Sequence, residues 1–205
     1  CPCCEHDVLF IAHNPWLRDH FKCSNCGCIP RERALMLTIK NEYPNWKDVQ
    51  KHESSPGNRG YNLTLKKHAR HYTTSQYYPN HPFGSIVNGF KNEDLEKQTF
   101  KDNSFDFVYC KDALHHVPRP YIALEEMFRV AKVGVIFSEP LDSEISKPKL
   151  DFIYKAIKKF FNKSANFHAF EEVGNYIYMF SPHEIEKFLL GRHKTEYFYK
   201  KFDDI

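Results

Sequence analysis

The stretch 91–134 constrains the fold more than any other part of this chain. It contains an apolar strand pattern at Phe105–Cys110, a His-rich loop and an amphipathic helix pattern at Arg119–Ala131, and a second strand pattern follows at Val133–Phe137. Two strands joined by a helix form a parallel βαβ unit, the building block of doubly wound sheets. The sequence therefore predicts an α/β fold whose ligands gather at the carboxyl ends of the strands.

Length and composition set the limits of this prediction. A chain of 205 residues can bury one core of ordinary size with a small appendage. An apolar content of 41%, an aromatic content of 16% and a mean hydropathy of -0.61 indicate a folded protein without a transmembrane span. The formal charge of +3 is too small to indicate nucleic acid by itself. No secretory signal is visible, and we expect a cytoplasmic protein.

The cysteines are concentrated at the start of the chain, where six of the seven fall within the first 28 residues. Cys1, Cys4, Cys23 and Cys26 have the spacing C-x2-C, an 18-residue spacer and C-x2-C, which is typical of a four-thiolate zinc site. A segment of about thirty residues has too little core to fold alone, so metal ligation would order it. We predict a structural zinc-ribbon module over residues 1–30.

Other uses of these cysteines remain open. A disulfide framework needs an oxidising compartment, which the lone Cys110 in a core strand and the absence of a signal disfavour. An iron-sulfur cluster is a further alternative. The ligand register could also shift to Cys3, and Cys28 or His6 could take the place of a predicted ligand.

The motifs of 91–134 resemble those of class I S-adenosylmethionine-dependent methyltransferases of the broad type 11 group. That group carries an acidic pair before F-x-D-N-S-F-D, then L-H-H-V or L-E-H-V, then R-x-L-K-x-G-G. The matching residues here are Asp94, Phe100, Asn103–Asp106, Leu114–Val117 and Arg129–Gly134. The helix pattern Ile29–Lys40, with its sequence PRERAL, is similar to a module that precedes some methyltransferase domains.

This resemblance implies a doubly wound, Rossmann-like methyltransferase domain over residues 31–205. The strands are expected at 46–53, 70–76, 85–90, 105–110, 133–137 and 195–202, and a pattern for the family's usual last strand is not apparent. An amphipathic helix at 147–163 would belong to a lid or acceptor insertion over 147–180. Ser181 and Glu184 form a capping box for a final helix that ends before Gly191.

The resemblance also implies a binding site for S-adenosylmethionine along the strand ends. The family carries an acid where this chain has Gln76, and an amide would bond the ribose hydroxyls without charge assistance. Asp94 and the backbone of Leu95 correspond to the adenine contacts. The full set of candidate cofactor residues is Glu53, Ser55, Gly57, Gln76, Asp94, Leu95 and Lys111.

Methyl transfer requires an aligned acceptor and, for a hydroxyl, a base that removes its proton. His115 and His116 leave the fourth strand at the ligand-binding edge, and a histidine near neutral pKa suits this task. Asp112 could orient the base or act itself. The alternative is that the second histidine packs beneath the loop. Further acceptor contacts are predicted at Glu139, His168 and Tyr176.

The predicted function is methyl transfer to an oxygen or nitrogen of a small molecule or glycan. HESSPG, SQYYP and EEVGNYIYMFSPHEIEKF are similar to segments of methyltransferases that modify sugars and surface polysaccharides. RNA methylation is an alternative that needs a basic patch joining Arg31, Arg33 and the 147–163 helix. A degenerate, zinc-dependent interaction module is a third hypothesis. An exposed aromatic edge near the end of the chain would fit a homo-oligomer.

Overall fold

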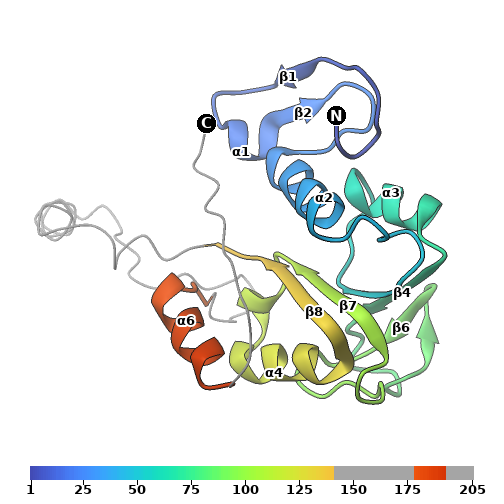
Figure 1. Cartoon of the computed structure of the whole chain (residues 1–205), viewed down its shortest axis with the longest axis vertical. Coiled ribbons are helices and arrows are strands. Elements are labelled where there is room, and N and C mark those ends of the chain that lie inside the picture. Colours follow the sequence, from blue (N-terminus) through green and yellow to red (C-terminus); the bar gives the residue numbers. More distant parts are fainter. Residues whose placement is uncertain (141–177, 193–205) are drawn as a thin grey trace, which may run out of the picture.

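The fold is taken from a computed structural model, which describes residues 1–140 and 178–192. Its centre is a six-stranded sheet with the order β5-β6-β4-β3-β7-β8 (Figure 1). The chain order reverses between β3 and β7, which are parallel neighbours. This arrangement confirms the predicted doubly wound α/β fold, in which ligands bind outside the carboxyl ends of the strands. The strands are β3 (Gln50–Ser54), β4 (His71–Gln76), β5 (Ile86–Val87), β6 (Phe90–Asn92), β7 (Phe105–Lys111) and β8 (Ala131–Ser138).

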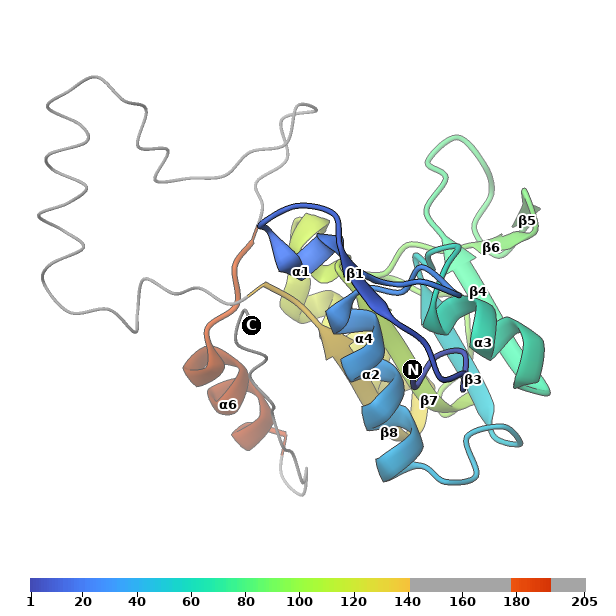
Figure 2. The ribbon, with the colours of Figure 1, turned by 90° about the horizontal axis from the view of Figure 1, so that it is seen from above.

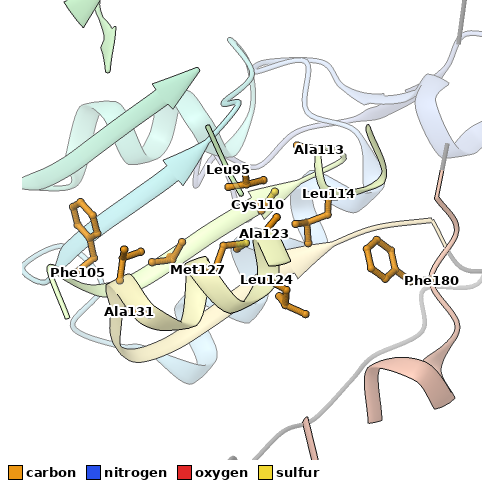
Figure 3. Close-up of a cluster of buried hydrophobic side chains, with 12 residues drawn as sticks. Leu95, Phe105, Cys110, Ala113, Leu114, Ala123, Leu124, Met127, Ala131 and Phe180 are labelled. Atoms are coloured by element: carbon orange, nitrogen blue, oxygen red, sulfur yellow. The ribbon is translucent and has the colours of Figure 1, made fainter. Parts of the chain in front are cut away.

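Helices cover both faces of the sheet, and each covered face has its own apolar cluster. On β7, Phe107 and Tyr109 pack with α2 (Pro30–Glu42) and α3 (Tyr61–His68), whereas Val108 and Cys110 face α4 (Pro120–Val130). Figure 3 shows side chains of β7 and α4 pointing toward one another. The helix α6 (Pro182–Leu190) packs on the same side as α4 (Figure 2). The alternation along β7 is that of a strand buried on both faces.

The helices begin where their sequences predict. Both α2 and α4 have proline in their first turn, where the missing N–H costs nothing. The buried positions Ala123, Leu124, Met127 and Val130 of α4 recur at helical spacing and form one apolar face. The capping box of Ser181 and Glu184 at the start of α6 is confirmed.

Residues 1–29 form a small module at the N-terminal end of α2 (Figure 1). Its two short antiparallel strands are β1 (Phe10–Ala12) and β2 (Phe21–Cys23), with the helical turn α1 (Leu17–His20) between them. The module packs on α2 and α3 through Cys3, Cys23 and Cys28. The module therefore has almost no apolar core of its own and uses cysteines at its contact with the sheet.

Two predicted strands need correction. The segment expected as one strand at 85–90 forms the short antiparallel strand β5, a turn through Asn88 and Gly89 with positive φ, and then the parallel strand β6. The first sheet strand, β3, begins at Gln50, because residues 44–48 form turns, with bonds from Trp46 N–H to the Tyr43 carbonyl and from Asp48 N–H to the Asn45 carbonyl.

The predicted 147–163 helix, most of the 147–180 insertion, the 195–202 strand, His168 and Tyr176 lie outside the described residues. Among the helices of residues 1–140 and 178–192, none combines the length and apolar content needed to cross a bilayer.

Candidate active site and cysteine cluster

The four predicted metal ligands come together in the module. The sulfur atoms of Cys1, Cys4, Cys23 and Cys26 all lie within 4.8 Å of one another. The Sγ–Sγ distances are 3.9 Å for both Cys1–Cys26 and Cys4–Cys23. Four thiolates about 2.3 Å from one zinc ion are roughly 3.8 Å apart in a tetrahedron. The donor set therefore fits zinc in number, chemistry and spacing.

A second thiol group adjoins the first. Cys3 and Cys28 are buried and lie with Cys1 in a group of three, with 3.4 Å between the sulfurs of Cys1 and Cys28. The neighbouring Cys3 and burial both raise the pKa of Cys28. Around Cys4, burial raises the pKa, but hydrogen bonds from Asn25 and the His6 backbone outweigh it and lower the value to about 6. Burial raises the pKa of Cys26 in the same group, so the protein alone favours the thiolate at Cys4 but not at every predicted ligand.

Glu53 is the penultimate residue of β3, and its side chain is enclosed by the protein. Its carboxylate is 0% exposed and accepts hydrogen bonds from the hydroxyls of Tyr61 and Tyr72 and, at 2.6 Å, from Asn62 Nδ2. Burial raises the pKa of Glu53 against the opposing effect of these donors. The side chain is thus enclosed by the protein's own donors, and a cofactor contact would need it to move.

The turn after β3 passes Ser55, which is exposed, and Gly57, which lies close to Asn62. Ser55 is exposed, has a φ of +53° and donates its N–H to the carbonyl of Ser75. A Cβ on Gly57 would lie 2.9 Å from Oδ1 of Asn62, a buried oxygen that has no hydrogen-bond partner among the described residues. Gly60 serves another purpose, because its Cβ would lie 2.7 Å from the Cβ of Cys28 in the module.

The remaining cofactor candidates follow the neighbouring strands. Gln76 is half-buried at the end of β4, and its carbonyl accepts the N–H of Glu93. Asp94 is half-buried and accepts the Glu96 N–H at 2.9 Å. Leu95 is 9% exposed and packs with Cys110 and the loop after β7 (Figure 3). These positions share the carboxyl edge of the sheet, as the sequence predicts.

A cavity of about 260 Å³ lies between this edge and the module. The sheet side contributes Asp112, which follows β7 and has a φ of +51°, His115 and Pro140. The other side is formed by Trp16, Arg18, Asp19 and Arg31. The cavity thus brings together two of the predicted catalytic residues, and the module forms its other side.

His115 is the buried member of the histidine pair. It belongs to the short helical turn η1 (Leu114–His116), and its Nδ1 bonds to the carboxylate of Glu139. The other oxygen of Glu139 accepts the N–H groups of Ala113 and Leu114 at 3.1 and 2.9 Å. His116 is exposed and lies against the His115 ring at 4.0 Å between centroids. The arrangement fixes the His115 ring at the cavity and leaves His116 outside its lining.

Ion pairs link the two sides of the cavity. Arg31 lies 2.6 Å from Asp19 of the module and 3.2 Å from Asp112 of the sheet. Lys111 also pairs with Asp112, at 3.0 Å. Arg33 donates to the carbonyls of Phe21 and Cys28. Arg31 therefore links the module to the loop after β7, and Arg33 links the module to α2.

Sequence reasoning missed the module's share of the cavity. Trp16, Arg18 and Asp19 lie in the spacer between the two cysteine pairs and carry no motif. They reach Asp112 only because the cysteine cluster packs against α2 and α3. The sequence placed Glu139 at the ligand edge, because it follows β8. Its bond to His115 could not be predicted, because that bond depends on the turn after β7.

The fold and site can be compared with known proteins. Residues 56–138 match a family model described as a methyltransferase domain. No curated protein matches the sequence. The matched segment begins in the turn after β3 and ends with β8, and so covers the edge that carries most of the candidate site.

Solved structures show the same fold. The YcgJ protein from Bacillus subtilis aligns with a TM-score of 0.53 and 16% identity, over 78% of this chain and 67% of that one. An S-adenosylmethionine-dependent methyltransferase from Methanosarcina mazei aligns at 0.45 and 18%, over 74% and 82%. A candidate methyltransferase from Bacillus halodurans aligns at 0.45 and 16%, over 70% of this chain and 58% of its own length. The family match concerns residues 56–138, and the likeness to the YcgJ protein is one of fold.

Proposed function

We propose that this protein transfers a methyl group from S-adenosylmethionine to an oxygen or nitrogen of a small molecule or glycan. One observation carries the proposal: His115, which is bonded to Glu139, lines a cavity at the end of β7 and lies inside the segment that matches a methyltransferase domain. In doubly wound sheets this edge is where ligands bind.

The cofactor would lie along the ends of β3, β4 and β6. The turn at Ser55 and Gly57 allows close backbone approach, and the unpaired Asn62 Oδ1 can accept a hydrogen bond from a cofactor donor such as the ammonium group. Gln76 is positioned to bond the ribose hydroxyls, and Asp94 to accept from the adenine amine. When bound, the cofactor supplies a methyl group on a positively charged sulfur. The residues present fit this group, apart from the enclosed Glu53.

His115 is the residue best suited to take the acceptor's proton. Because a carboxylate only accepts, the bond to Glu139 assigns the proton of a neutral His115 ring to Nδ1. Nε2 then keeps its lone pair and can accept a proton while the acceptor atom attacks the methyl carbon. Glu139 holds the ring and stabilises the imidazolium that forms. Asp112 is engaged by Arg31 and Lys111, which suits an orienting role better than that of a base.

We also propose that Cys1, Cys4, Cys23 and Cys26 hold one structural zinc ion. The four thiols complete a closed tetrahedral set, so zinc would have no open position for a substrate. Its contribution would be to fix the module against the sheet.

Two residues that the RNA alternative needs are already engaged in contacts within the protein. It needs a basic patch that includes Arg31 and Arg33, but Arg31 is paired with two carboxylates and Arg33 is bonded to backbone carbonyls. A small, polar acceptor agrees better with these contacts.

Calorimetric titration with S-adenosylmethionine and its demethylated product tests the cofactor step. We expect one site for each ligand. Gly57→Ala should weaken binding, because its Cβ would displace the Asn62 side chain, whereas Gly191→Ala at the end of α6 meets only ordinary contacts and should bind normally. Absence of heat and of a thermal shift at millimolar ligand would instead favour the interaction-module hypothesis.

Transfer of a radioactive methyl group tests the base. With an accepted substrate, His115→Gln should reduce turnover by roughly 100-fold or more, the usual contribution of general base catalysis. His116→Gln serves as the matched neighbour and should retain most of the activity. Full activity in both variants would reject a histidine base.

A further inference from the structure

The cavity beside His115 has two walls from different parts of the chain. Trp16, Arg18 and Asp19 come from the module, and Asp112, His115 and Pro140 come from the ends of β7 and β8. Arg31, at the start of α2, joins them by pairing with Asp19 and Asp112. The site is incomplete without the module.

We propose that the cysteine module forms part of the acceptor site, and that this site takes a neutral, polyhydroxylated ring such as a single sugar unit. The inference rests on the proposed methyl transfer and adds an acceptor class and residues that select it. Trp16 and Asp19 would be specificity-determining residues.

Cavity size supports a small acceptor. Its volume of about 260 Å³ lies just below the roughly 300–1,000 Å³ of pockets for drug-sized ligands. A single ring fits this space better than a nucleotide or an oligomer. The groups of a longer glycan would extend beyond the cavity.

The charges of the lining support a neutral acceptor. The lining carries two guanidinium groups, of Arg18 and Arg31, and an equal number of carboxylates, of Asp19 and Asp112, both of which contact Arg31. An anionic acceptor would have to compete with these carboxylates for Arg31. Hydroxyl groups have no such cost, because each can donate to a carboxylate and accept from a guanidinium.

Trp16 supplies the apolar surface that such a ring needs. Trp16 is 59% exposed although it lines the cavity. The flat aromatic surface can cover the C–H face of a sugar, while Asp19 and Arg31 bond the hydroxyls at its rim. A site built to bond hydroxyls also rejects analogues that lack them.

The cysteine cluster controls the position of this wall. Trp16 and Asp19 lie in the spacer whose two ends are tied by Cys4 and Cys23. The wall is also held by pairing of β1 with β2, by the ion pair between Asp19 and Arg31, and by the bond from Arg33 to the Phe21 carbonyl. Without the metal the two ends of the spacer would no longer be tied, and we expect the acceptor wall to lose its fixed position while the cofactor edge of the sheet stays folded.

Saturation-transfer NMR tests the acceptor class on the full chain, with the demethylated cofactor present. The probes are glucose, galactose, mannose and rhamnose, with glucose 1-phosphate and glucuronate as anionic counterparts and catechol as an aromatic one. At least one neutral sugar should show saturation transfer that exceeds that of its anionic counterparts and of catechol. Trp16→Ala and Asp19→Asn should each reduce this signal at least five-fold.

Leu9→Ala and Asp7→Asn are the matched controls, because both residues are exposed in the module and neither lines the cavity. Both should keep the sugar signal. Each variant is also checked for metal content and for binding of the demethylated cofactor, which shows that a lost signal does not come from unfolding. Removing the metal with a chelator should abolish the sugar signal while cofactor binding persists, and added zinc should restore it.

Two results would overturn the inference: no neutral sugar contacts the wild-type protein, or Trp16→Ala and Asp19→Asn bind sugar as well as the controls do. A preference for the anionic probes would likewise contradict it. Because the cofactor titration is read separately, any of these outcomes leaves the proposed methyl transfer standing. Failure of cofactor binding would remove both.

Discussion

The cysteine module and the sheet differ in what they bury. In residues 1–29 the buried residues are three cysteines and Ile29, while Leu9, Phe10, Ile11 and Trp16 remain exposed. The sheet buries two apolar clusters, one on each face. A segment as short as the module cannot bury enough surface to fold by itself, so the cysteines have to replace the core. We therefore expect the module to depend on its metal and the sheet to depend on its apolar residues, although the module's three buried cysteines belong to one of the two clusters.

The largest effect is expected from removing a metal ligand. Cys23→Ser should abolish stoichiometric zinc and disorder the module, because metal binding contributes roughly 10–16 kcal/mol in isolated zinc fingers. The sheet should stay folded on its own clusters. Metal analysis and segment-resolved hydrogen exchange would measure both results, with the adjacent exposed residue changed in Ser24→Ala as control. Retained zinc, or unfolding of the sheet together with the module, would contradict the division into two regions.

The sheet should respond to acid through His52. This side chain is 0% exposed, and burial, assisted by Lys91, lowers its pKa from 6.5 to about 3. Between pH 6.5 and about 3, His52 is protonated in the unfolded chain but stays neutral in the folded chain. The free energy of unfolding therefore decreases as the pH falls from 6.5 toward 3. The loss could reach about 5 kcal/mol at the lower end.

Urea unfolding between mildly acid and neutral pH would measure this dependence. His52→Gln should flatten the curve, because glutamine can still bond to Ser75 without taking up a proton. His71→Gln, on the exposed start of β4, should leave the slope unchanged. A wild-type protein whose stability does not fall with acid would show that His52 is not held neutral.

The sequence predicted the sheet far better than the cavity. Local patterns define β7 and α4, since apolar residues alternate on both faces of one and recur at helical spacing in the other. The thiol spacing likewise brings four sulfurs together, because each pair is local. The enclosure of Glu53 depends on Tyr72 from the neighbouring strand, and the wall at Trp16 depends on packing of the module against α2 and α3. Such contacts between distant segments leave no periodic signal in one sequence.

Gly60 lies where the module contacts the rest of the protein, and its substitution should lower the stability of the folded state. Its φ is +55°, and a Cβ there would lie 2.7 Å from the Cys28 Cβ and from a Glu32 carboxylate oxygen. Gly60→Ala should therefore cost more than the roughly 1–2 kcal/mol that the left-handed conformation alone demands. Gly89→Ala is the matched control, because Gly89 also has a positive φ of +83° but nothing within 4 Å. Urea unfolding that gives equal losses would show that close contact with the module adds nothing to the joint.

The smallest effect is expected at the surface ion pair across the same joint. Glu5 of the module contacts Lys40 of α2, with side chains 60% and 23% exposed, and Lys40 holds the pKa of Glu5 below 4.5. The carboxylate therefore stabilises the folded state above pH 4.5, and this contribution disappears as acid protonates it. Exposed pairs contribute at most about 1 kcal/mol and are screened by salt, so Glu5→Gln should lower stability by less than this and only at low salt. Glu42→Gln, an exposed carboxylate at the end of α2, provides the comparison in the same urea measurement. A larger, salt-resistant loss at Glu5 would mean that ion pairs rather than packing at Gly60 and the cysteines fix the module on the sheet.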